Sequence, residues 1–210
     1  MKKLINYLFE TIKKQKSILI FITITFLIGL IFGSLFINFI SEEDKNLLVN
    51  QVVTYFNSIK NLSDDVFGLK VITPAIINNL LQILSIFILG ISMIGILFVI
   101  FIMFFKGFTL GMTISTIIFK YELKGVLGAF LYVFPCLVLN ILIYIFISFF
   151  AVCASIKFIK ALLKKGKLNF KSFLGKYLLA FIISIILIVI LSVLDSFMTP
   201  LLLKLFTLLL

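Results

Sequence analysis

The sequence predicts an all-α integral membrane protein with about five transmembrane helices and a cytoplasmic N-terminus. Hydrophobic residues make up 63% of the 210 residues and charged residues only 13%. Mean hydropathy is +1.32, and a soluble domain of this size could not cover so much apolar surface with polar groups. The lysines gather at 2–16 and 157–176, separated by long apolar stretches. Lysine-rich short loops stay on the cytoplasmic side of a membrane, so both clusters indicate the inner face.

The formal net charge of +11 would suggest nucleic-acid binding in a soluble protein. Here no basic stripe is interleaved with exposed aromatic residues, the pattern that binds single strands. We interpret the charge as cytoplasmic loops that face anionic headgroups of the lipid bilayer. No nucleic-acid partner is expected.

Residues 1–16 form a basic cytoplasmic N-terminus, and the apolar run 17–40 is the first predicted span. About 20 apolar residues suffice to cross a bilayer. A signal peptide has a shorter apolar core and a small-residue cleavage site, and neither is present. The run therefore predicts an uncleaved first helix.

Residues 41–75 form an acidic loop that we place outside the cytoplasm. Ser41, followed by Glu42 and Glu43, is typical of a helix N-cap with acids in the first turn. Apolar residues then recur at helical spacing, which predicts an amphipathic helix from about 42 to 61. Its apolar stripe must face lipid headgroups, the helix bundle or a partner.

The second span is predicted at 84–105 and a short third span at 107–121, with a turn at Lys106-Gly107. The helix before them is expected to start at Thr73-Pro74, a capping hydroxyl followed by proline. The short stretch alone would fit a re-entrant segment. Because the two lysine clusters share one side, an even number of spans must separate them, so it is assigned as a span.

The fourth span is predicted at 126–156, after a short outer turn at Lys120, Glu122 and Lys124. The lysine-rich loop 157–176 follows on the cytoplasmic side.

The fifth span is predicted at 177–194. Pro200 is expected to end any continuation of this helix. The tail 195–210 is apolar but too short to span, which predicts an interfacial helix.

No catalytic set, cofactor motif or metal site is recognisable: histidine is absent and no Walker, G-x-S-x-G or zinc pattern occurs. Cys136 and Cys153 lie in one apolar run, typical of buried small hydrophobic residues. We therefore expect a protein that is not an enzyme. An intramembrane enzyme is the weakest reading and would depend on Asp195.

Pro135 and Asn140 are the irregular positions of the fourth span. Asn140 could bond to a neighbouring helix or to a carbonyl freed near the proline. Alternatively, the two residues line a polar pathway, as in the broken helices of transporters.

Six glycines have the spacing of close helix packing. Missing side chains let helix backbones approach closely. We interpret them first as contacts inside the bundle and second as a homodimer contact: Gly29, Gly33, Gly90, Gly95, Gly107 and Gly111.

The order of these features resembles the stage II sporulation protein M (SpoIIM) family. The resemblance covers most of the chain and includes the first span around Gly29 and Gly33, the acidic outer helix, the Gly90 and Gly95 stretch running into Lys106-Gly107, the Phe134-Pro135 pair and the lysine loop after Ser155. Family members tend to carry Gln, His or Asn directly after the proline, whereas Cys136-Leu137 stand here.

The resemblance implies a non-enzymatic protein of the bacterial mother-cell membrane that acts in engulfment during endospore formation. Its implied partners are peptidoglycan hydrolases, an amidase/endopeptidase and a lytic transglycosylase. The alternative is a transporter or channel subunit, suggested by the short third span and the proline. On the scaffold reading, the expected partner contacts lie on the external helix: Glu42, Glu43, Tyr55, Phe56 and Ile59.

Overall fold

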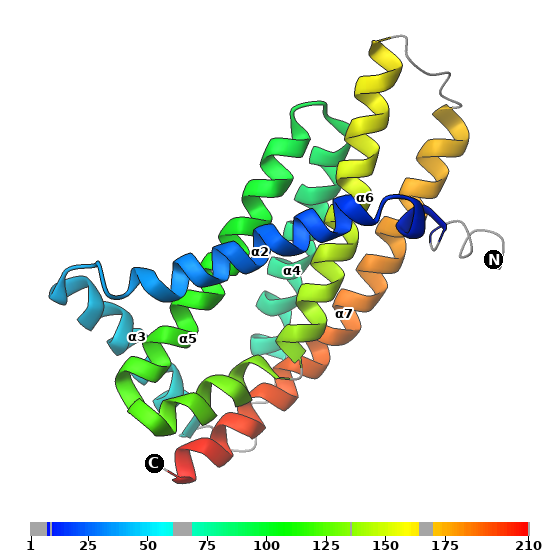
Figure 1. Cartoon of the computed structure of the whole chain (residues 1–210). Helices are drawn as coiled ribbons and strands as arrows, with labels where there is room; N and C mark the ends of the chain where they lie inside the picture. The colour runs from blue at the N-terminus through cyan, green and yellow to red at the C-terminus, as the bar shows by residue number, and fades with distance from the viewer. Residues whose placement is uncertain (1–7, 9, 61–68, 135, 164–169, 210) are drawn as a thin grey trace.

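The computed structural model describes residues 8, 10–60, 69–134, 136–163 and 170–209. These residues form helices and no strand. The helices are, in chain order, α2 (Lys16–Phe36), α3 (Glu42–Lys60), α4 (Leu69–Ile91), α5 (Gly95–Val133), α6 (Cys136–Leu162) and α7 (Phe170–Leu209) (Figure 1).

Five of these helices are long and apolar enough to cross a membrane: α2, α4, α5, α6 and α7. Their outward residues include many large apolar side chains, such as Phe32 on α2 and Leu97 on α5, which are 60% and 70% exposed. Such a surface requires lipid as its solvent. The predicted class, an all-helical membrane protein with five spans, is confirmed.

Helix α6 is the centre of the bundle. It packs against α2, α4, α5 and α7, and its residues from Ile143 to Ser155 are buried with the exception of Phe146. A helix that is apolar on every side is expected to be surrounded by other elements. Helix α2 crosses the bundle obliquely against α5 (Figure 1).

The predicted turn at Lys106-Gly107 is wrong, and with it the boundary between spans 84–105 and 107–121. Helix α5 continues through both residues, and the chain turns earlier, at 92–94. Glycine inside a helix costs only about 1 kcal/mol relative to alanine, and Gly107 is packed against α2. A single lysine and glycine therefore do not end this helix.

The predicted turn around Glu122 is present. Glu122 has φ 53° and ψ −129°, which divides α5 into a long helix and a short one that follows it. In Figure 1 the short helix runs across the end of the bundle toward α6.

The predicted continuous span 126–156 is wrong, because it contains two helices. Helix α5 ends at Val133, Phe134 is extended with φ −105° and ψ 136°, and α6 begins at Cys136. Proline forces the preceding residue out of the helical region, so Pro135 explains the break. Pro135 itself lies outside the described residues.

Two further helix boundaries differ from the predictions. Helix α4 begins at Leu69 and holds Pro74 in its second turn, and α7 runs through Pro200 to Leu209. A proline removes one backbone hydrogen bond but need not end a helix that tertiary contacts hold. Beyond Pro200, Leu203 and Phe206 are fully buried, and this packing holds the tail on the bundle.

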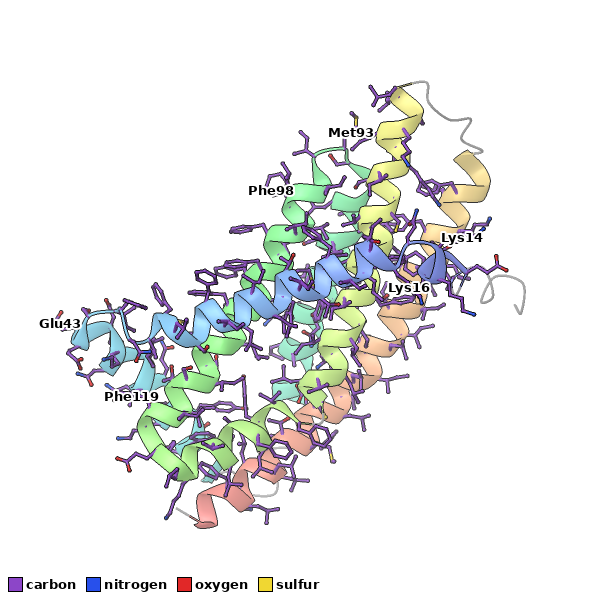
Figure 2. The ribbon with its side chains drawn as sticks, in the orientation of Figure 1. Lys14, Lys16, Glu43, Met93, Phe98 and Phe119 are labelled. Atoms are coloured by element: carbon purple, nitrogen blue, oxygen red, sulfur yellow. The ribbon has the colours of Figure 1, made fainter. Side chains whose placement is uncertain are left out.

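The two ends of the bundle differ in chemistry. Figure 2 shows Lys14 and Lys16 at the start of α2, far from Glu43 and Phe119. The α4–α5 turn at Met93, the C-terminal end of α6 and the N-terminal end of α7 lie at the other end from α3, Glu43 and the C-terminal end of α7 (Figures 1 and 2). We call the end that carries α3 the acidic end and the opposite one the basic end.

Candidate functional site

The N-terminus of α3 is capped by Ser41, as the sequence predicts. The backbone N–H of Asp44 donates to the Ser41 hydroxyl at 3.2 Å, and that hydroxyl donates to the Asp44 carboxylate at 2.7 Å. Glu42 pairs with Lys45 at 2.9 Å. The acids also lie at the positive end of the helix dipole, which stabilises them.

The apolar stripe of α3 meets the bundle. Phe56 and Ile59 are each 2% exposed. They pack in a cluster with residues of α5 and α7: Ile117, Ala129, Leu203 and Phe206. The Phe56 ring lies 5.6 Å from that of Tyr121 and 5.7 Å from that of Phe206. As partner contacts, Phe56 and Ile59 are therefore wrong: helical spacing identified the stripe, but not which of three surfaces would cover it.

The opposite side of α3 is exposed. Leu47 and Tyr55 are 62% and 44% exposed, and Glu42 and Glu43 are exposed at the helix start. A shallow groove of about 470 Å³ follows this side and is lined by Leu47, Asn50, Gln51, Thr54, Tyr55 and Ser58. We call these lining residues together with Glu42 and Glu43 the outer face of α3.

Tyr55 belongs to the outer face and also lies near Tyr132 and Asp195 of the bundle. Partial burial raises the pKa of Tyr55 to about 12, with smaller contributions from Tyr132 and from the negative charge of Asp195. The phenol is therefore neutral across the physiological range and serves as a hydrogen-bonding and apolar group rather than as an acid.

The glycines on α2 and α5 lie where the two helices cross. A Cβ atom on Gly29 or Gly33 would collide with the carbonyl oxygen of Phe104 or Phe108. From the side of α5, a Cβ on Gly107 or Gly111 would likewise collide with backbone carbonyl oxygens of α2. The four glycines thus form one reciprocal contact inside the chain.

The other two glycines flank the α4–α5 turn. A Cβ on Gly90 would collide with the Tyr177 hydroxyl and with Ala151, and a Cβ on Gly95 with the carbonyl of Leu89. All six glycines therefore occupy close approaches within one chain.

A polar network connects α4, α6 and α7 inside the apolar bundle. The Tyr144 hydroxyl donates to Asn79 Oδ1 at 2.8 Å, and Asn79 Nδ2 donates to the Ser192 hydroxyl at 2.8 Å. Hydrogen bonds between membrane helices are worth about 0.6 to 2 kcal/mol each. These bonds join helices that are far apart in sequence.

Lys106 adds α5 to this network. Its ammonium donates to Gln82 Oε1 and lies 3.5 Å from the centre of the Tyr144 ring. Among the described residues, no carboxylate is within ion-pair distance of Lys106. This lysine is the twelfth residue of α5, roughly 16 Å along the helix from Gly95 at 1.5 Å per residue.

The position of Lys106 differs from the sequence expectation. The sequence placed it at a span end, because the turn was predicted there. A lysine near the centre of a spanning helix costs about 2.5 to 3.5 kcal/mol on insertion scales and marks a functional site by default. The signal that could have identified the network is the spacing of Asn79 and Gln82 on α4, three residues apart and on one helix face.

Asn140 is buried, with 4% of its surface exposed. Among the described residues, no donor lies within hydrogen-bond distance of its Oδ1. The bond expected from Asn140 to a carbonyl would be donated by its side-chain nitrogen, so the unpartnered oxygen does not test that expectation. Asn140 does not join the network of Asn79, Tyr144 and Ser192.

A cavity of about 640 Å³ lies beside Lys106, between α4 and α5. Gln82, Lys106, Thr109 and Thr113 contribute polar groups to it, and Tyr132 contributes from the short end of α5. The remaining lining is mostly apolar, including Leu81, Phe101, Ile102, Phe105, Leu110 and Leu137. Concave sites of about 300 to 1,000 Å³ with few polar groups are typical of small-molecule sites.

The described acidic side chains near the acidic end do not form a recognisable catalytic or metal-binding site. Asp195 accepts a hydrogen bond from the Thr199 hydroxyl. In the described part of the chain, no three His, Cys, Asp or Glu residues are placed to hold a metal ion. Cys136 and Cys153 are buried free thiols.

A family model described as stage II sporulation protein M matches residues 22–200 of the chain. The matched region includes α3, the α2–α5 glycine contact and the network around Lys106. Comparison with curated proteins and with solved structures gave no match.

Proposed function

The chain belongs to the stage II sporulation protein M family, and from this premise we propose that it is a membrane scaffold that recruits peptidoglycan hydrolases during engulfment in endospore formation. In this proposal α3 lies outside the cytoplasm and both lysine clusters lie inside, in a bacterial cytoplasmic membrane. The family is not a known enzyme family, which favours a scaffold over a catalyst.

The observation that carries this proposal is the way α3 is held. One side is anchored by Phe56 and Ile59, while the outer face remains open along the helix. A rigid element loses little conformational entropy when a partner binds. An anchored helix with an exposed aromatic side chain at Tyr55 and acids at its start therefore suits a docking role.

The acids Glu42 and Glu43 favour a partner with a basic patch on its docking surface. Charge complementarity of this kind speeds association and selects the orientation of the partner. Tyrosine is enriched among the residues that dominate binding energy at interfaces, so Tyr55 is the proposed anchor.

The test is a pull-down of the full chain, in detergent, from sporulating cells with the candidate hydrolases as the measured quantity. We expect the combined Glu43→Lys and Tyr55→Ala variant to recover at least about ten-fold less hydrolase, the effect of losing roughly 1.4 kcal/mol of binding free energy. Asn57→Ala is the matched control, since Asn57 is exposed on the same helix but does not line the groove. Unchanged recovery with the double variant would rule out this surface.

A transporter or channel subunit is the second candidate function. The cavity beside Lys106 favours it, because intramembrane ionisable residues often lie on substrate or ion pathways. Asn140, by contrast, supplies little support for a pathway, because it does not line this cavity, and Pro135 lies outside the described residues.

A further inference from the structure

We propose that the cavity beside Lys106 is a binding site for an anionic membrane lipid. This proposal goes beyond the scaffold function, since it involves neither α3 nor a protein partner. It depends on where the cavity opens, on which polar group is available inside it, and on the charge of that group.

The cavity opens toward the lipid-facing side of the bundle. Leu81, Phe101 and Phe105 line it and are 55%, 61% and 52% exposed. These residues lie within two helices that are long and apolar enough to span. In a bilayer, the medium at such an opening is lipid, so an occupant with an apolar chain can enter from the side.

The charged group available to a ligand in the described lining is the Lys106 ammonium, and the Tyr132 hydroxyl and the Gln82 amide also face the cavity. The hydroxyls of Ser85, Thr109 and Thr113 each donate to a backbone carbonyl of their own helix. An ammonium has three N–H donors. The bond to Gln82 uses one of the three, and the Tyr144 ring lies over the same ammonium, which leaves donor capacity for an anion.

The charge of Lys106 selects the class of lipid. A cation in apolar surroundings is stabilised by a paired anion, and the described residues supply none within ion-pair distance. Basic pockets between membrane helices on the cytoplasmic side bind the head groups of acidic phospholipids, and Lys106 lies roughly 16 Å along α5 from Gly95 at the basic end. The amide of Gln82 positions the ammonium, and the apolar walls accommodate part of an acyl chain.

The experiment uses the absence of tryptophan from the chain. A Phe105→Trp variant carries one reporter on the cavity wall, and an Ile190→Trp variant carries one on the exposed side of α7. Each protein is reconstituted in phosphatidylcholine vesicles that contain either brominated phosphatidylglycerol or brominated phosphatidylcholine. Bromine on the acyl chains quenches tryptophan fluorescence at contact distance.

We expect the reporter at position 105 to be quenched more strongly by the phosphatidylglycerol than by the phosphatidylcholine, and the reporter at position 190 equally by both. Adding Lys106→Met to the Phe105→Trp protein should lower the preference for phosphatidylglycerol roughly ten-fold, the usual effect of losing one charge-assisted hydrogen bond. Lys106→Arg should retain it. Lys120→Met is the matched control on the same helix, since Lys120 is exposed and outside the cavity lining.

Far-UV circular dichroism of each variant shows whether the fold is kept. Gln82→Leu is a second change in the same site that removes no charge, and it should also weaken the preference for phosphatidylglycerol. Equal quenching of the Phe105→Trp protein by both lipids would overturn the proposal. So would a preference that survives Lys106→Met. A response of the reporter to inorganic phosphate in vesicles of phosphatidylcholine alone would also overturn it, because the site would then take a soluble anion from water.

Discussion

The side chain of Phe56 anchors α3 to helices α5 and α7. Its ring contacts Tyr121 of α5 and Phe206 of α7, and these two rings also contact each other at 5.7 Å. Three aromatic rings from three helices thus meet at one point. Aromatic pairs of this kind add about 0.5 to 1.5 kcal/mol each beyond the area that they bury.

The Phe56→Ala substitution is therefore expected to destabilise the protein by about 3 to 5 kcal/mol, the range for a buried phenylalanine. Thermal unfolding in detergent, followed by circular dichroism, measures this loss. Tyr55→Ala removes the neighbouring, half-exposed ring and should change stability far less. If the two variants unfold at the same temperature, Phe56 does not anchor α3.

At the scale of elements, α2 and α5 share the most extensive contact among the described helices. Four glycines, two from each helix, let the backbones touch where the helices cross. Dispersion and close packing hold membrane helices together, because apolar burial provides no net driving force in lipid. This contact explains why α5 stays helical through Gly107 although the charge of Lys106 suggests a loop.

We expect Gly107→Ala to lower stability by about 1 to 3 kcal/mol, the usual cost of overpacking, since the new Cβ meets the Phe26 carbonyl. Gly175→Ala is the matched control, because a Cβ there has nothing within 4 Å. Alanine has the higher helix propensity by about 1 kcal/mol, so this control should be neutral or stabilising. The measurement is the unfolding temperature in detergent, and equal temperatures for both variants would contradict the proposed packing.

At the scale of the whole molecule, the distribution of charge along the bundle favours one orientation in the membrane. Lys14 and Lys16 lie at one end of α2 and Glu43 at the other (Figure 2). The α4–α5 turn, the C-terminal end of α6 and the N-terminal end of α7 also lie at the basic end (Figure 1). Because lysine-rich segments stay in the cytoplasm, we place α3 outside it.

This orientation can be tested with single cysteines in a Cys136→Ala, Cys153→Ala background. An impermeant thiol reagent added to intact cells should label a protein with Asn57→Cys and should spare one with Lys160→Cys. After permeabilisation both should react, since both positions are exposed. The reverse labelling pattern in intact cells would show that the protein has the opposite orientation in the membrane. An extracytoplasmic docking surface on α3 would then have no basis.

The sequence predicted those features that depend on the composition of a short segment. Transfer into lipid depends on the local apolar content, which predicted four of the five spans. The short stretch 107–121 was assigned as a span only because the two lysine clusters share one side of the membrane. The Ser41 cap and the turn at Glu122 depend on neighbouring residues only and were also predicted correctly. Exposed acids at the start of α3 are expected from their charge, but helical spacing did not separate the exposed Tyr55 from the buried Phe56 and Ile59.

The tertiary structure decided what depends on contacts between distant segments. Close backbone packing keeps α5 helical at Gly107 and thereby moves Lys106 from a span end into the bundle, beside Gln82 and Tyr144. Residues of α5 and α7 cover Phe56 and Ile59, which helical spacing alone could equally have assigned to a partner. Hydropathy and spacing are properties of one segment, whereas which surfaces meet depends on the energy of packing several segments together.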